Sequence, residues 1–213
     1  MTFGHAVTMT ADVTWLADGQ DPDPVHRRTI SMEVFEDGSS FEVVGRLRDE
    51  RPWADGVLHA ALIHDMDLRL KVDRSTLTIT VARATMNTFP HAECPTITPS
   101  FEALVGLSVA RGYTREVQER FGRAKGCSHL EFLARALGPV VVQAIPSSAA
   151  RNPDPASLGE SVAGGGWLTN TCHLWAEGGL GQQKLEIGWR PGIGEYPAPS
   201  LVEIKRRLAD PKA

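Results

Sequence analysis

The sequence predicts an α+β protein, with an antiparallel sheet of about five strands or more and one face of that sheet covered by helices. Polar and apolar residues alternate along most of the first 85 residues, as in strands that are buried on one side. From about residue 98 the apolar residues recur at helical spacing instead. Strands that precede helices in the chain are typical of the α+β class.

We expect one domain over residues 1–213, a length sufficient for a sizeable core. Its predicted parts are an N-terminal sheet over about 6–85, a helical part over about 98–145, a mobile loop over about 146–166, and C-terminal strands with a final helix over 167–213. The loop is predicted because this stretch is rich in Ser, Ala, Pro and Gly.

The predicted sheet is built from one strand and two hairpins. Residues 7–15 alternate, and their apolar face consists of Val7, Met9, Ala11, Val13 and Trp15. A hairpin over about 29–48 turns at residues 37–40, and a second over 64–81 turns at 73–76. In the second hairpin His64 shares the face of Met66 and Leu68, so we expect it to point toward the core.

Helix boundaries follow from capping residues. Pro99 suits a first helical turn, and Thr114 is predicted to cap a short helix that ends at Gly122. Ser128 and Glu131 have the spacing of a capping box, which predicts a helix from His129 onward. Within that helix the pair at 138–139, Gly-Pro, predicts a kink or a break.

The C-terminal part is predicted to contain strands over 167–175 and 184–189. Ser200 and Glu203 form a second capping box and predict a last helix.

Composition excludes several classes of protein. The net charge is −4 and no basic cluster is longer than residues 205–207, so we expect no nucleic-acid partner. No apolar run approaches the ~20 residues of a membrane span, and the N-terminus does not resemble a signal peptide. Three cysteines are too few for a disulfide framework, so we expect a cytoplasmic protein with reduced thiols. A homodimer through a sheet edge or the last helix is a further expectation.

The predicted start of the helix at Ser128 is the first candidate site. Cys127 and His129 flank the cap, where free N–H groups and the helix dipole favour a thiolate or an oxyanion. A buried thiol beside an exposed imidazole is the structural alternative. His64 is a candidate base from the sheet, although a histidine on an apolar face is often only a packed residue.

A third feature is Thr171–Leu174, with Trp167 and Trp175 on either side. In a strand His173 would share a face with both tryptophans, as in a pocket for a flat ligand. The alternative is a packed edge strand.

The cysteines also suggest a zinc site as an alternative. Cys94, Cys127, His129 and Cys172 could supply four ligands, but their spacing does not match a CxxC…CxxC pattern. We therefore predict no cofactor, with zinc as the alternative.

With these residues identified, the chain resembles an uncharacterised bacterial domain-of-unknown-function family. The matching motifs are a basic pair at 27–28, I-H-D-M at 63–66, C-P at 94–95, G-C-S-H-L at 126–130 and T-C-H at 171–173. Ser128 replaces the threonine of the family motif and keeps the capping hydroxyl, while Leu174 replaces a small residue. Members resemble genes found among pathways for aromatic or acyl compounds, which implies an enzyme acting on small molecules.

We therefore expect a cofactor-independent acid/base enzyme for a hydrophobic, aromatic small molecule. The predicted reaction is a retro-aldol lyase step that releases a small aldehyde, with His64 as base and His129 and His173 as partners. Cys127, Ser128, Trp167 and Trp175 are expected to contact the substrate. The alternatives are a zinc-dependent hydrolase or lyase, and a binding protein for a small molecule or acyl thioester without turnover.

Overall fold

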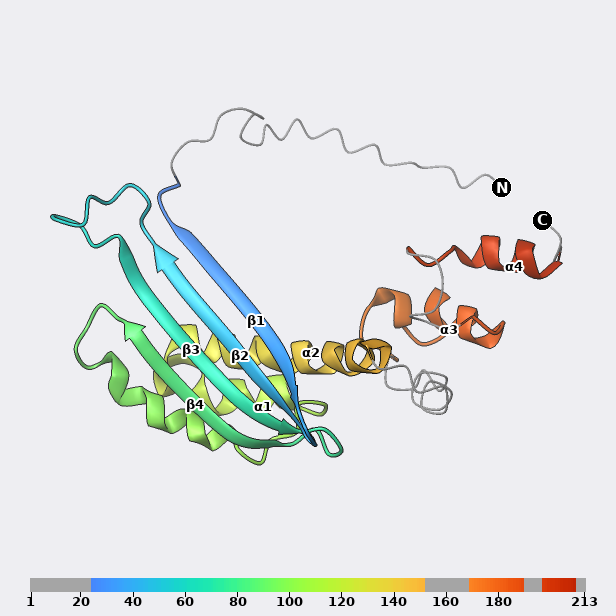
Figure 1. Ribbon diagram of the computed structural model, residues 1–213, viewed down its shortest axis with the longest axis horizontal. Helices are drawn as coiled ribbons and strands as arrows, with labels where there is room; N and C mark the ends of the chain where they lie inside the picture. The colour runs from blue at the N-terminus through green and yellow to red at the C-terminus, as the bar shows by residue number, and fades with distance from the viewer. Residues whose placement is uncertain (1–23, 152–168, 190–196, 210–213) are drawn as a thin grey trace, which may run out of the picture.

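The computed structural model describes residues 24–151, 169–189 and 197–209 (Figure 1). Four antiparallel strands form one sheet in chain order, namely β1 (Arg27–Asp37), β2 (Ser40–Glu50), β3 (Leu62–Asp73) and β4 (Ile79–Thr88). The sheet and the helices that follow it confirm the α+β prediction. The described sheet has four strands rather than about five, and the predicted strand at 7–15 lies outside the described residues.

Both predicted hairpins are present, and local chemistry explains their turns. Gly38 has φ 57°, a left-handed conformation that glycine adopts without steric cost, and it joins β1 to β2. Between β3 and β4 the Asp73 carboxylate accepts hydrogen bonds from Ser75 and Thr76. These bonds favour the ionised carboxylate and lower the pKa of Asp73 to about 2.

The helical layer covers the apolar face of the sheet. It consists of η1 (Cys94–Leu104), α1 (Tyr113–Phe121), η2 (Arg123–Lys125) and α2 (Ser128–Arg151). Helix α2 packs across β1, β2 and β3, while η1 packs against β4 (Figure 1). Gly45 in β2 permits this close packing, since a Cβ there would lie 3.1 Å from Leu137 Cδ2.

The helix does not break at 138–139, one of the two outcomes predicted there. Helix α2 runs from Ser128 to Arg151 through both Pro139 and Pro146. Leu137 and Val141 on either side are fully buried, so tertiary packing outweighs the one backbone bond that proline removes. Gly138 serves close packing instead, since a Cβ there would lie 2.4 Å from the Tyr113 ring. The helix also extends past residue 146, where the loop was predicted to begin.

The start of α2 also differs from the predicted capping box. The N–H of Glu131 donates to the carbonyl of Cys127, which makes Cys127 the cap residue and Ser128 the first residue of the helix. The Glu131 carboxylate forms an ion pair with Arg135 instead.

The predicted C-terminal strands are wrong for the residues that the structure describes. This part forms η3 (His173–Trp175), α3 (Leu180–Glu186) and α4 (Leu201–Ala209). The Trp175 ring packs where a Cβ at Gly181 would lie, so the chain folds back on itself here. Short apolar runs do not distinguish strand from helix, which explains the error. The cap of α4 is confirmed, because the Ser200 hydroxyl accepts the N–H of Glu203 at 3.1 Å.

Within the described ranges, no helix combines the length and apolar character required to cross a membrane.

Candidate functional site

A row of three polar side chains crosses one end of the sheet. The strand register places Arg28 of β1 opposite Asp49 of β2, and Asp49 opposite His64 of β3. All three lie on the face that packs against the helices, because they continue the alternation of inward positions such as Leu47 in β2 and Met66 in β3. Charged groups therefore stand at the edge of an otherwise apolar core.

Asp49 is the centre of this group, and its side chain is only 1% exposed. Arg28 binds it in a bidentate manner, with Nε 2.6 Å from Oδ1 and Nη2 2.7 Å from Oδ2. Burial by itself would raise the pKa of Asp49, but Arg28, with smaller contributions from His64 and His129, outweighs burial and lowers it to about 2. Asp49 is thus a buried carboxylate that stays ionised.

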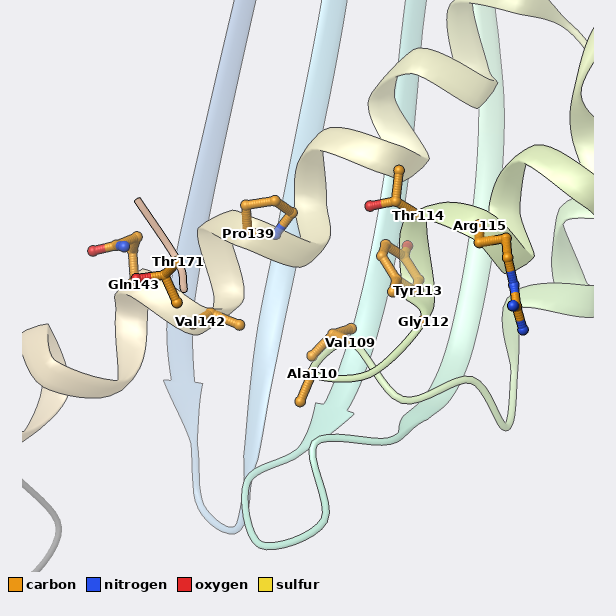
Figure 2. Close-up of a pocket in the computed structure, with 10 residues that line it drawn as sticks. All are labelled: Val109, Ala110, Gly112, Tyr113, Thr114, Arg115, Pro139, Val142, Gln143 and Thr171. Atoms are coloured by element: carbon orange, nitrogen blue, oxygen red, sulfur yellow. The ribbon is translucent and has the colours of Figure 1, made fainter. Parts of the chain in front are cut away.

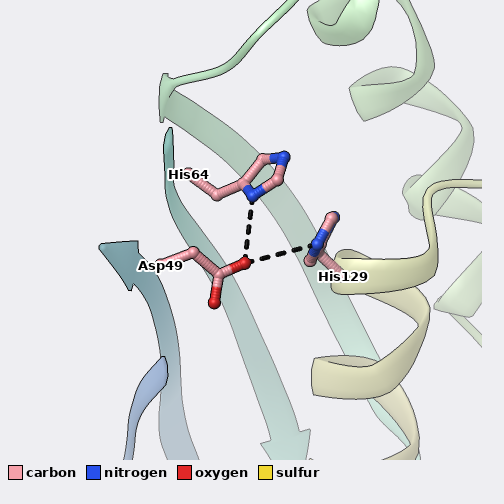
Figure 3. Close-up of side chains that lie close together, drawn as sticks. All are labelled: Asp49, His64 and His129. Carbon is pink, nitrogen blue, oxygen red and sulfur yellow. Dashed lines mark hydrogen bonds and ion pairs between the residues drawn. The ribbon is translucent and has the colours of Figure 1, made fainter. Parts of the chain in front are cut away.

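His64 lies against this carboxylate, with Nδ1 3.0 Å from Asp49 Oδ2 (Figure 3). An ionised carboxylate only accepts hydrogen bonds, so Nδ1 of His64 carries the proton. In the neutral ring the lone pair is then on Nε2. The contact with Asp49 therefore fixes both the tautomer and the orientation of His64.

His129 approaches the same oxygen from the first turn of α2. Its Nε2 lies 3.4 Å from Asp49 Oδ2, and its ring centre lies 4.0 Å from that of His64 (Figure 3). Burial, together with the nearby His64 and Arg28, lowers the pKa of His129 against the opposing effect of Asp49. The neutral form of His129 is therefore favoured at pH 7.

Cys127 and His26 lie beside this group. The thiol Sγ of Cys127 is 3.7 Å from Nδ1 of His129. From the chain segment before β1, His26 places Nε2 3.3 Å from Oδ1 of Asp49, and nearly half of its side chain is exposed. Three imidazoles and one guanidinium thus surround a single carboxylate.

The loop between β2 and β3 borders this end of the sheet and presents apolar side chains to solvent. Trp53 donates its indole N–H to the Val25 carbonyl, which ties the loop to the segment that carries His26. Val25, Val57 and Leu58 are each more than 80% exposed, and Trp53 is about half exposed. Apolar side chains are therefore exposed on the loop that connects the strand of Asp49 to the strand of His64.

Of the predicted site residues, the structure brings together His64, His129 and Cys127, with Ser128 exposed on the adjoining turn. Sequence reasoning missed Asp49, Arg28 and His26. The sequence does contain a signal for Asp49, because Asp49 continues the series of inward positions in β2 that runs from Phe41 to Leu47. A carboxylate at an inward position requires a partner.

His173 and Trp175 lie elsewhere, in η3. Thr171 lines a pocket with Pro139, Val142 and Gln143 of α2 and residues of α1 (Figure 2). His129 and Gln143 are fourteen residues apart in α2, a rise of about 21 Å along the helix axis. The exposed His173 is therefore not brought to the Asp49 group, and Trp167 lies outside the described residues.

The four alternative zinc ligands are not brought together as one set, although Cys127 and His129 lie side by side. Cys94 begins η1, and Cys172 is exposed in the C-terminal part. Among the described residues, one group of three histidine, cysteine or acidic side chains has the spacing of metal ligands, and it consists of Asp49, His64 and His129. His129 is the single residue common to both sets.

Comparison with known proteins identifies the family but no relative of known activity. No curated protein and no solved structure matches the chain. The family of proteins of unknown function DUF2889 matches residues 26–143, which include β1 to β4, the Asp49 group and most of α2. Since this match covers more than half of the sequence, the chain belongs to the DUF2889 family.

Proposed function

We propose that this protein is a cofactor-independent acid/base lyase for hydrophobic, aromatic small molecules. In the proposed reaction His64 removes a proton from the substrate, and a retro-aldol C–C cleavage releases a small aldehyde. The observation that carries the proposal is the contact between the buried, ionised Asp49 and Nδ1 of His64.

This contact supports His64 as the base. Nε2 makes no hydrogen bond to any other residue that the structure describes, so its lone pair is available to a substrate. Asp49 stabilises the imidazolium that forms when Nε2 accepts a proton, as carboxylates do in other histidine-based sites. Asp49 itself is held ionised by Arg28, and does not compete for the proton.

We assign His129 to a hydrogen bond with the reacting oxygen. Its ring is close to His64, and its lowered pKa favours the neutral form, so it adds no charge to a partly buried site. In this role Nε2 of His129 exchanges its 3.4 Å contact with Oδ2 of Asp49 for the substrate oxygen.

The bonds that change can be written for a substrate with a hydroxymethyl group next to a carbon that can carry negative charge. His64 takes the hydroxyl proton, the oxygen forms the carbonyl of formaldehyde, and the C–C bond breaks. The electron pair of that bond passes to the carbon left behind and into the conjugated substrate. The His64 imidazolium then returns the proton to that carbon, so the sum is an elimination of formaldehyde that needs no redox cofactor.

The exposed apolar loop supports the substrate class. Trp53, Val57 and Leu58 lie on the segment that connects Asp49 to His64 along the chain. Exposed apolar side chains at a polar site favour a ligand with a large apolar surface.

The test is turnover by the purified full-length protein on a panel of hydroxymethyl aromatics, with released formaldehyde as the readout. We expect release with at least one member of the panel, and a loss of about 10²-fold or more in kcat for His64→Gln. The matched control is His91→Gln, which removes an exposed histidine from the segment between β4 and η1 and should retain activity.

No turnover across the panel, or full activity of His64→Gln, would overturn the proposal. An aromatic ligand that copurifies unchanged would favour the alternative of a binding protein.

A further inference from the structure

We infer that Asp49, His64 and His129 also form a binding site for a divalent transition-metal ion such as Zn²⁺, and that occupation of this site silences His64 as a base. The binding part stands on geometry alone. The silencing part rests on the proposed function.

The three side chains have the separations of ligands around one ion. Zinc binds imidazole nitrogen and carboxylate oxygen at about 2.0–2.2 Å, which places neighbouring ligand atoms of a tetrahedral site about 3.3 Å apart. Oδ2 of Asp49 lies 3.0 Å from Nδ1 of His64 and 3.4 Å from Nε2 of His129. One ligand atom from each of the three residues lies within 4.8 Å of the other two.

The bidentate contact with Arg28 leaves room for the ion. A carboxylate has about four lone-pair positions, and Arg28 occupies one on each oxygen. The same oxygen, Oδ2, faces both His64 and His129 (Figure 3). Arg28 would then be the outer partner that orients the ligating carboxylate, as such partners commonly do in metal sites.

The donor set also indicates the class of ion. Two imidazoles and one carboxylate suit zinc and other late first-row metals, whereas Mg²⁺ and Ca²⁺ prefer oxygen ligands. His64 comes from β3, Asp49 from β2 and His129 from α2, so three packed elements fix the ligands before the ion arrives. Such preorganisation lowers the cost of binding.

Metal binding and proton abstraction exclude each other because a neutral imidazole has one lone pair. In the metal-free protein the proton of His64 is on Nδ1 and the lone pair is on Nε2. An ion between Asp49 and His64 takes the lone pair at Nδ1, and the ring proton moves to Nε2. His64 then presents an N–H to the substrate and has no position left to accept a proton.

The experiment measures Zn²⁺ binding to the metal-free, full-length protein by calorimetry, with metal content after dialysis as a second readout. We expect about one ion per chain. His129→Ala and His64→Gln should each weaken binding by about tenfold or more, since even loss of an outer partner commonly weakens a metal site this much. Circular dichroism establishes that each variant is folded.

Two controls separate this site from the other candidate ligands. A variant with Cys94 and Cys172 both changed to Ser should bind like the wild type, and so should His173→Gln. Absence of binding, loss of binding in the Cys94→Ser/Cys172→Ser variant, or unchanged binding in both His64→Gln and His129→Ala overturns the inference.

The activity arm distinguishes failure of this inference from failure of the proposed function. We expect Zn²⁺ to inhibit formaldehyde release and a chelator to restore it. A protein that binds Zn²⁺ at these residues and requires it for turnover overturns both the silencing and the cofactor-independent reaction. A protein that binds Zn²⁺ but has no turnover with or without the ion retains the site and loses the proposed function.

Discussion

Asp49 and His64 face each other across neighbouring strands, with Nδ1 of the histidine 3.0 Å from Oδ2 of the carboxylate. This pair is at the end of the sheet's apolar face, where α2 begins and adds His129. Burial of a carboxylate costs free energy unless the group is paired. The four nitrogen-bearing side chains around Asp49 therefore stabilise the folded protein, whatever further role they have.

His173 is a predicted catalytic partner that the structure does not bring to the Asp49 group. It lies in η3, near the opposite end of α2. We expect His173→Gln to change kcat and KM by less than about twofold, a difference well under 1 kcal/mol in transition-state stabilisation. Steady-state kinetics beside the wild type measures this, and a loss comparable with that of His64→Gln would return His173 to the site.

Asp49→Asn tests the contribution of the buried carboxylate to stability. The amide keeps the shape but loses the charge, and leaves the Arg28 guanidinium without its partner. Since Arg28 is partly exposed, we expect a loss of roughly 1–3 kcal/mol in the free energy of unfolding, measured by urea denaturation. Asp67→Asn is the matched control, because the Asp67–Arg46 pair lies on the outer face of the sheet and should contribute less than about 1 kcal/mol. Equal losses in the two variants would contradict a special role for Asp49.

The lowered pKa of Asp49 predicts how stability depends on pH. Its pKa is about 2 in the folded protein and 3.8 in the absence of these partners. The folded state thus holds the carboxylate ionised, so the contribution of Asp49 is fully present above about pH 5 and is lost as the pH falls toward 2. The gap in stability between the wild type and Asp49→Asn should therefore narrow between pH 5 and about pH 2, as followed by denaturation at each pH. A gap that stays constant or widens on acidification would show that the carboxylate is not held ionised by folding.

Gly138→Ala tests the contact that allows α1 and α2 to pack closely. Alanine is the better helix former by about 1 kcal/mol, but its Cβ would lie 2.4 Å from the buried Tyr113 ring. Overpacking of a core typically costs about 1–3 kcal/mol, so we expect a net loss of stability and a lower Tm. Ala136→Gly is the comparison for helix propensity, since it should cost about 1 kcal/mol with no steric overlap. A stabilised Gly138→Ala protein would show that the ring can move aside.

By itself, the sequence determined the α+β class, both hairpins, the inward direction of His64 and the start of a helix beside Cys127 and His129. Alternation and turn chemistry are local, so residues within a few positions of each other are sufficient to specify them. The same alternation would have revealed Asp49 as an inward carboxylate, but no local pattern names its partners.

The tertiary structure alone decided that Arg28, Asp49, His64 and His129 meet. Strand register aligns Arg28, Asp49 and His64, and the path of α2 across the sheet brings His129 to them. Both the register and the helix path depend on contacts between distant parts of the chain. Tertiary packing also keeps α2 helical through two prolines and folds the predicted C-terminal strands into η3 and α3. The side chains of the candidate site are therefore visible in the sequence, while their convergence depends on long-range packing.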